Sequence, residues 1–181
     1  AELAGAALLQ RAGIDFRFVR PTGKKRSDYD VEAVLGGERI CFEMKGKVSD
    51  PSSRTVVATL LGAADQLPLD TPNVVVIQPP NDWVIREDGF HALEAGIAEF
   101  FRKSDRVARV ITHADEWRTV QQQGVEGIGA MVSRRYLVHI NPNPVTPFPS
   151  AVTNTKWLEE TGRHWLGLDE VMATPERLRY L

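Results

Sequence analysis

The sequence has little cysteine and no long apolar run, and both absences bear on where the protein works. Cys41 is the single cysteine among 181 residues, so no internal disulfide can form, which fits a reducing compartment. No apolar run approaches the roughly 20 residues needed to cross a bilayer, and no charged segment followed by an apolar one opens the chain. We therefore expect a cytoplasmic protein without a membrane partner.

Several functional motifs are also missing. Neither a Gly-x-Gly-x-x-Gly after a strand nor a Gly-x-x-x-x-Gly-Lys-Ser/Thr occurs, so nucleotide-binding folds have no support. The net charge of −2 lacks the basic excess of a protein that coats nucleic acid, which counts against a pure binding module. The histidines lack the spacing and the cysteine company of a zinc site, so we expect structural roles for His91, His113, His139 and His164.

Two adjacent glycines, Gly36 and Gly37, separate two β-prone runs between residues 27 and 47. A Gly-Gly pair in this position predicts a two-residue hairpin. If Leu35 pairs with Glu38, counting back along both strands pairs Val34 with Arg39, Glu32 with Cys41, Asp30 with Glu43 and Asp28 with Lys45. Two carboxylates, those of Asp30 and Glu43, would then meet directly across the ladder.

Alternation along the strands divides this hairpin into two faces. The charged face would hold Asp28, Asp30, Glu32, Glu43 and Lys45. The other face, which we expect to be core, would hold Tyr29, Val31, Ala33, Leu35, Ile40, Phe42 and Met44. Cys41 falls on the charged face, where a buried thiol packed among small residues is the expected role.

The opposed carboxylates need a compensating charge. Directly opposed side chains lie about 5 Å apart, and at an effective dielectric of about 20 their repulsion is roughly 3 kcal/mol. A divalent cation such as Mg²⁺, which accepts one or two carboxylates together with waters and substrate phosphate, would offset it. Lys45 is the next residue outward on the same face, where its ammonium could orient the attacking water, help deprotonate it, or stabilise charge on a phosphate. These residue types predict a hydrolytic site.

The arrangement Asp, β-turn, Glu-x-Lys resembles the PD-(D/E)xK nuclease superfamily, which includes restriction-enzyme-like and Holliday-junction-resolvase branches. The matching residues here are Asp30, Glu43 and Lys45. The resemblance implies Mg²⁺ or Mn²⁺ held by the acidic pair and by the Met44 carbonyl, with Glu2 as the glutamate that a preceding helix often adds. Asp28 competes with Asp30 for the metal position. Gln66 is a candidate for the glutamine that some branches carry in the following helix.

By this resemblance, the expected function is metal-dependent hydrolysis of phosphodiester bonds, with a DNA endonuclease as the leading expectation. Cutting both strands of a duplex would favour a homodimer or a larger complex. Three alternatives stay open. The chain could be an inactive member of the fold that binds nucleic acid or a protein partner, or an unrelated α/β protein with an accidental match. The hairpin could also be a surface ribbon in which Lys45 pairs with Asp28 as an ordinary charge ladder.

The order of expected elements agrees with that resemblance over roughly residues 1 to 80. We expect a helix over 1–12 ended by Gly13, a strand over 14–19, the hairpin, a helix that begins near Asp50 and ends before Pro68, and a buried strand over 73–78. This α-β-β-β-α-β order predicts a mixed central sheet flanked by helices, with a restriction-endonuclease-like core.

Beyond residue 80 the pattern predicts a helix over 89–103, a strand over 107–112, a helix over 114–123 and a strand over 135–140. The Pro-rich stretch 141–149 then closes a nuclease domain that spans 1–149. Residues 150–181 form a C-terminal extension that is apolar enough to pack on this core or on a partner. Trp83 and Trp117 could stack on bases, although packing is the expected role.

Basic residues flank the proposed site on both sides of the hairpin. Those expected to bind nucleic acid are Arg20, Lys24, Lys25 and Arg26 before it, and Lys47 and Arg54 after it. Such cations could hold the phosphates on either side of the scissile one while the acidic centre holds the metal. The alternative interpretation is a solvated basic loop with no ligand.

Overall fold

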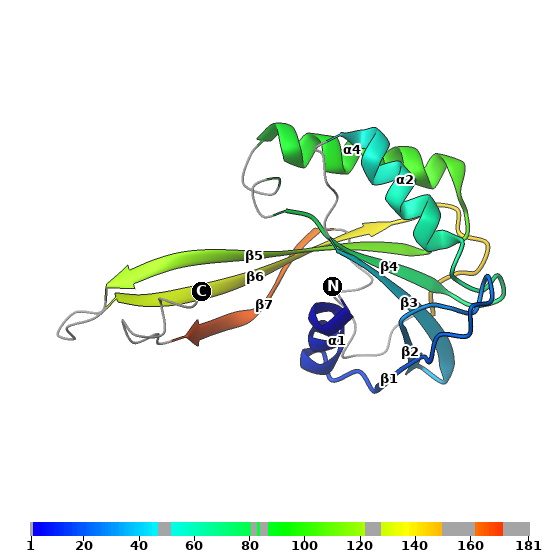
Figure 1. Ribbon diagram of the computed structural model, residues 1–181, viewed down its shortest axis with the longest axis horizontal. Coiled ribbons are helices and arrows are strands. Elements are labelled where there is room, and N and C mark those ends of the chain that lie inside the picture. Colours follow the sequence, from blue (N-terminus) through cyan, green and yellow to red (C-terminus); the bar gives the residue numbers. More distant parts are fainter. Residues whose placement is uncertain are drawn as a thin grey trace.

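The computed structural model describes residues 2–46, 52–80, 83, 87–121, 128–149 and 162–171, and it has an α/β fold with a mixed, open sheet flanked by helices. Figure 1 shows helices on both faces of the sheet. The elements are α1 (Glu2–Arg11), β1 (Phe16–Phe18), β2 (Val31–Leu35), β3 (Glu38–Gly46), α2 (Ser53–Ala64), β4 (Asn73–Gln78), α4 (Glu87–Lys103), β5 (Arg109–Gln121), β6 (Ile128–Ile140) and β7 (Gly162–Val171). Within the described residues these strands form a seven-stranded sheet in chain order, from β1 to β7.

The hairpin between β2 and β3 has the predicted turn and the predicted register. Gly36 and Gly37 have φ of 60° and 86°, the left-handed values that a two-residue hairpin of this type requires. Leu35 pairs with Glu38, and Glu32 pairs with Cys41. Because the turn determines the register, the glycine pair decides which side chains of β2 and β3 meet.

Two parallel connections follow the hairpin. The chain leaves β3, crosses through α2 and returns as β4 parallel to β3. It then crosses through α4 and returns as β5 parallel to β4. Five of the six residues of β4 are buried, as the continuous apolar run of this segment predicted. No helix in the described segments is both long and apolar enough to cross a membrane.

The sheet separates two hydrophobic cores, one on each face. The core under α1 includes Leu8, Leu9, Val31, Ile40, Phe42 and Met44, and the core under α2 and α4 includes Tyr29, Cys41, Val56, Leu60, Ile97 and Phe100. The prediction that Tyr29 shares a face with Val31 is therefore wrong. β2 begins only at Val31, so strict alternation does not extend back to Tyr29. Trp83 lies buried in the second core, as expected for packing.

The predicted helix over 114–123 is also wrong. β5 continues as a strand to Gln121, and each of its residues pairs with a residue of β6. Helix-forming residues such as Ala114, Glu116 and Gln121 favoured a helix, but a continuous ladder supplies every backbone partner that a helix would have supplied. β7, which lies within the predicted C-terminal extension, pairs antiparallel with β6. In Figure 1 the far ends of β5, β6 and β7 extend away from the helices as an arm.

Gly96 allows α2 and α4 to pack closely. A Cβ atom at Gly96 would lie 2.6 Å from the Cβ of Val56 and 3.0 Å from the backbone oxygen of Ser53. Neither of these atoms can move without moving α2, because one belongs to the backbone and the other is the branch point of a β-branched side chain. The position of α2 over the sheet therefore depends on a glycine in α4.

We expect Gly96→Ala to lower the free energy of unfolding by about 1 to 3 kcal/mol, the usual cost of overpacking. Gly62→Ala is the matched control, because a Cβ there meets nothing within 4 Å. Replacing this exposed helical glycine should raise stability by up to about 1 kcal/mol. Urea denaturation of both variants measures the difference, and equal stabilities would contradict the close helix contact.

Candidate active site

The structure brings together the two carboxylates that the hairpin register predicted. Asp30 directly precedes β2, and its N–H donates to the Phe42 carbonyl at 3.1 Å. Its Oδ2 accepts a hydrogen bond from the Met44 N–H at 2.7 Å, which holds the side chain against β3. Glu43 lies within β3, and the negative charge of Asp30 is close enough to raise the pKa of Glu43. The acidic pair therefore spans the start of β2 and the outer half of β3.

Glu43 is a buried acid, and only one of its two carboxylate oxygens has a hydrogen-bond partner among the described residues. Its side chain is 2% exposed, and burial raises its pKa from 4.5 to about 7, with the negative charge of Asp30 acting in the same direction. The hydrogen bond from Lys45 opposes this rise. Oε2 of Glu43 is buried and has no hydrogen-bond partner within the described part of the chain. Burial also raises the pKa of Asp30, although the Met44 N–H opposes it.

Lys45 stands at the solvent side of this pair. Its ammonium donates to Glu43 Oε1 and, at 2.8 Å, to Oε1 of Gln66, which follows α2. The Lys45 side chain is 28% exposed, so it connects the buried acid with solvent. Gln66, a candidate from sequence, thus reaches the site even though it lies beyond the helix end. The interpretation of the hairpin as an exposed ladder pairing Lys45 with Asp28 is wrong.

Asp28 serves the loop before the hairpin. Its Oδ1 accepts hydrogen bonds from the Thr22 N–H at 2.6 Å and from the Thr22 hydroxyl at 2.7 Å. Those bonds hold the pKa of Asp28 below its usual value. Ser27 Oγ donates to the Lys24 carbonyl at 3.0 Å, which closes the same loop. The role of Thr22 was not foreseen, although Thr-Gly and Ser-Asp are both turn-forming pairs.

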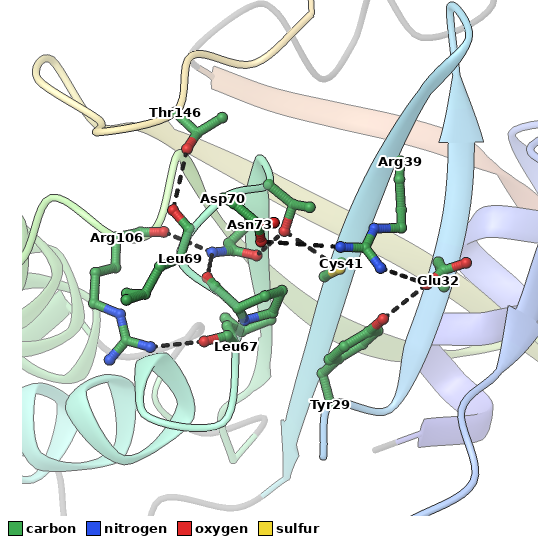
Figure 2. A network of polar contacts seen from close by, with 12 residues as sticks. Tyr29, Glu32, Arg39, Cys41, Leu67, Leu69, Asp70, Asn73, Arg106 and Thr146 are labelled. Carbon is green, nitrogen blue, oxygen red and sulfur yellow. Dashed lines mark hydrogen bonds and ion pairs between the residues drawn. The ribbon is translucent and has the colours of Figure 1, made fainter. Parts of the chain in front are cut away.

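Glu32, the third acid of the hairpin, is neutralised by neighbouring side chains. It is 8% exposed and accepts hydrogen bonds from the Tyr29 hydroxyl at 2.7 Å and from Arg17 at 2.7 and 3.1 Å. Arg39 approaches Oε2, the oxygen that also accepts from Tyr29, at 3.7 Å. Burial would raise the pKa of Glu32, but the Tyr29 and Arg17 hydrogen bonds outweigh it and the pKa is lowered. Figure 2 shows Glu32 between Tyr29 and Arg39.

The same polar network holds the segment that carries Gln66. Arg106 donates to Asp65 at 3.0 Å and to the Leu67 carbonyl at 2.6 Å. Asn73 donates to the Pro68 carbonyl at 2.7 Å, so the residues on both sides of Gln66 are tied down (Figure 2). No local pattern in the sequence indicates these roles, because Arg106 contacts residues far away in the chain and Asn73 also bonds the Arg106 carbonyl. These contacts hold the backbone around Gln66, whose side-chain amide accepts a hydrogen bond from Lys45.

Cys41 is fully buried in the core under α2 and α4, as expected for a packed thiol. The Thr71 hydroxyl donates to its sulfur at 3.5 Å, as drawn in Figure 2. Burial raises the pKa of this thiol. A buried, protonated thiol is a poor nucleophile, so Cys41 has a structural role.

α1 approaches the site through a second close-packed glycine. A Cβ atom at Gly5 would collide with the Sδ and Cε atoms of Met44, so the backbone of α1 lies directly on this side chain. Glu2 lies in the first turn of α1, where it is exposed. Its negative charge contributes to the raised pKa of Asp30. Glu2 therefore lies within electrostatic range of Asp30, although α1 covers the face of the sheet opposite to α2 and α4.

The donor set fits a hard divalent cation. Across the described segments, no group of three or more His, Cys, Asp and Glu residues forms a ready-made metal cage. Mg²⁺ does not need one, because it is usually bound by one or two carboxylates and completes its shell with waters and substrate phosphate. The unpartnered Oε2 of Glu43 and the adjacent Asp30 provide those carboxylates. The Met44 carbonyl and Glu2 are additional oxygen donors nearby.

The predicted nucleic-acid-binding residues lie on exposed surface where the structure describes them. Arg20, Lys24, Lys25 and Arg26 are exposed in the loop between β1 and β2. Arg54 is exposed in the first turn of α2. Lys47 lies outside the described residues, as do the side chains of Trp117 and His164. The basic loop therefore follows β1 directly and precedes Asp30 by a few residues.

Comparisons with models of protein families, with curated proteins and with solved structures found no match to this chain. Any functional conclusion therefore depends on the geometry of the site itself.

The raised pKa of Glu43 makes metal-free stability depend on pH. Between about 4.5 and 7 the folded state keeps a proton that the unfolded state has lost, so the free energy of unfolding falls as pH rises, by up to about 3 kcal/mol. Asp30, with its raised pKa, acts in the same direction. His139 acts in the opposite direction, because burial lowers its pKa to about 4.

The difference between wild type and Glu43→Gln isolates this contribution. In EDTA, chemical denaturation from pH 4 to 8 should show that the variant gains stability relative to wild type as pH rises, because the amide carries no charge to bury. A difference that stays constant over this range would contradict a strongly raised pKa for Glu43.

Proposed function

We propose that the protein is a nuclease that depends on Mg²⁺ or Mn²⁺ and hydrolyses phosphodiester bonds in nucleic acid, with DNA as the leading substrate. The observation that carries this proposal is the buried Glu43 carboxylate, which has an unpartnered oxygen beside Asp30 and a lysine at its solvent side. The order helix, three strands, helix, strand supports a restriction-endonuclease-like core. The parallel pairing of β3 with β4 agrees with that interpretation.

Each residue of the site has a separate task in this proposal. Asp30 and Glu43 would hold the cation, assisted by the Met44 carbonyl and Glu2. When bound, the cation supplies Lewis-acid stabilisation of the phosphate and makes bound water more acidic. Lys45 donates a hydrogen bond to the attacking water or to a phosphoryl oxygen, where negative charge develops in the transition state. Gln66 holds the Lys45 ammonium in position through their 2.8 Å contact.

The charge distribution supports a polyanionic substrate even though the whole chain is slightly acidic. The cations of the loop 20–26 and Arg54 lie on exposed surface, where they can hold phosphates that flank the scissile bond. Glu43 is instead buried and Asp30 is half-buried, so the pair repels the approaching backbone less than two solvated carboxylates on the surface would. The second candidate, an inactive module that binds nucleic acid or a protein, would not need two adjacent carboxylates with raised pKa values.

We expect the assignment of Asp30 rather than Asp28 to be visible in metal binding. Asp30→Asn should weaken Mn²⁺ binding at least about tenfold, because a charged ligand is lost. Asp28→Asn should leave it nearly unchanged, because Asp28 is hydrogen-bonded to Thr22. Calorimetric titration of the two variants measures the difference, and the reverse ranking would transfer the metal site to Asp28.

Cleavage tests the function itself. Plasmid and single-stranded substrates should be cut in Mg²⁺ or Mn²⁺ and not in EDTA, and Lys45→Ala or Glu43→Ala should slow cutting by about 100-fold or more. Lys103→Ala is the matched control, because this lysine is exposed and pairs with Glu99 within α4. We expect its activity to equal that of wild type.

Two results would contradict the proposal. Cutting that survives both active-site substitutions would come from a contaminant or from another site. Absence of cutting together with absence of metal binding would favour the inactive binding module.

A further inference from the structure

The edge strand β1 carries an exposed aromatic side chain directly before the basic loop. β1 is the first strand of the sheet, and Phe18 at its end is 53% exposed. Its ring packs edge to face with that of Phe16, with centroids 5.8 Å apart and planes at 85°. Phe16 is in turn packed against the core under α1. The Phe16 ring therefore supports the Phe18 ring, and an edge-to-face contact leaves at least one face of the Phe18 ring free.

Phe18 lies beside the metal-site aspartate. It pairs with Val31, the residue that follows Asp30. The next residue, Val19, donates its N–H to the Asp30 carbonyl at 3.0 Å. Because Phe18 pairs with Val31, its side chain lies on the face of the sheet under α1, whereas alternation along β3 places Glu43 with Cys41 on the face under α2. Phe18 is therefore close to Asp30 along the backbone, and its ring lies on a different face from Glu43.

The chain continues from β1 into the basic loop. Arg20, Lys24, Lys25 and Arg26 are all exposed between residues 20 and 26. Hydrogen bonds to Asp28 and between Ser27 and Lys24 hold the loop in shape. An exposed aromatic ring followed by a set of cations is the combination that binds single-stranded nucleic acid, because bases stack on the ring and phosphates pair with the cations.

We propose that Phe18 and the basic loop bind an unpaired strand of nucleic acid, with one base stacked on Phe18 and adjacent phosphates held by the loop. The substrate class is then a single strand, or the single-stranded arm of a branched duplex. A paired base cannot stack on Phe18, since both of its faces are covered within the duplex. This inference rests on the proposed nuclease function, because it names the class of substrate that the nuclease would bind.

Binding without cleavage tests this inference. Fluorescence anisotropy in EDTA compares a labelled mixed-sequence single strand with its own duplex. Phe18→Ala should weaken single-strand binding by about 5- to 100-fold and leave duplex binding nearly unchanged, whereas Phe18→Tyr should restore single-strand affinity. Val34→Ala is the control, because Val34 is another exposed apolar residue, 58% exposed on the neighbouring strand. We expect it to bind both substrates as wild type does.

The basic loop gives an independent measurement. Lys24→Ala should reduce the slope of log affinity against log salt for the single strand by about 0.7, the value for one phosphate contact. Melting temperatures of all variants identify any loss of folding, and Phe18→Tyr keeps the stacking test valid if Phe18→Ala unfolds.

Three outcomes would overturn the inference. The first is unchanged single-strand affinity in Phe18→Ala, and the second is an equal loss of affinity for single strand and duplex. The third is that Phe18→Ala alters only self-association or the binding of a protein. If Phe18→Ala binds and cuts the single strand as wild type does, this inference fails and the nuclease function stays intact. Single-strand binding lost in Phe18→Ala, in a protein that cuts nothing, would support the inference while the nuclease function failed.

Discussion

Burial of the Glu43 carboxylate beside a second carboxylate is the constraint on which the candidate site depends. Removing one charge from water costs several kcal/mol, and a nearby like charge adds to that cost. The fold meets it in part with the Lys45 ammonium and in part with a pKa of about 7, which lets the acid hold a proton near neutrality. One oxygen still lacks a hydrogen-bond partner among the described residues, and the cation that we propose would bind there.

The hairpin treats its acids in different ways. Glu32 is surrounded by Tyr29, Arg17 and Arg39, which lower its pKa and keep it ionised as part of the framework. Asp28 organises the basic loop through Thr22. Asp30 and Glu43 receive no arginine in the described contacts and retain raised pKa values. Perturbed acids that face one another in this way are typical of functional sites, whereas satisfied acids are typical of structural ones.

α2 links the fold to the site. Gly96 of α4 lets the two helices pack closely, and Arg106 and Asn73 tie down the residues around Gln66 where the chain leaves α2. Gln66 then accepts a hydrogen bond from the Lys45 ammonium, which also donates to Glu43. On the other face, Gly5 seats α1 on Met44 and carries Glu2 toward Asp30. Two layers of helix thus converge on one end of β3.

Local signals in the sequence determined the hairpin, its register, α1, α2, α4 and β4. Gly36 and Gly37 decide which residues pair, and the continuous apolar run over 73–78 favours a buried strand. Tertiary structure decided what local preference could not. Residues 114–121 pair with β6 although they favour a helix, Tyr29 turns to the face under α2, and Arg106 holds the residues on both sides of Gln66 from far along the chain. The physical reason is that backbone partners and burial are supplied by residues far along the chain, and they outweigh propensities of less than about 1 kcal/mol per residue.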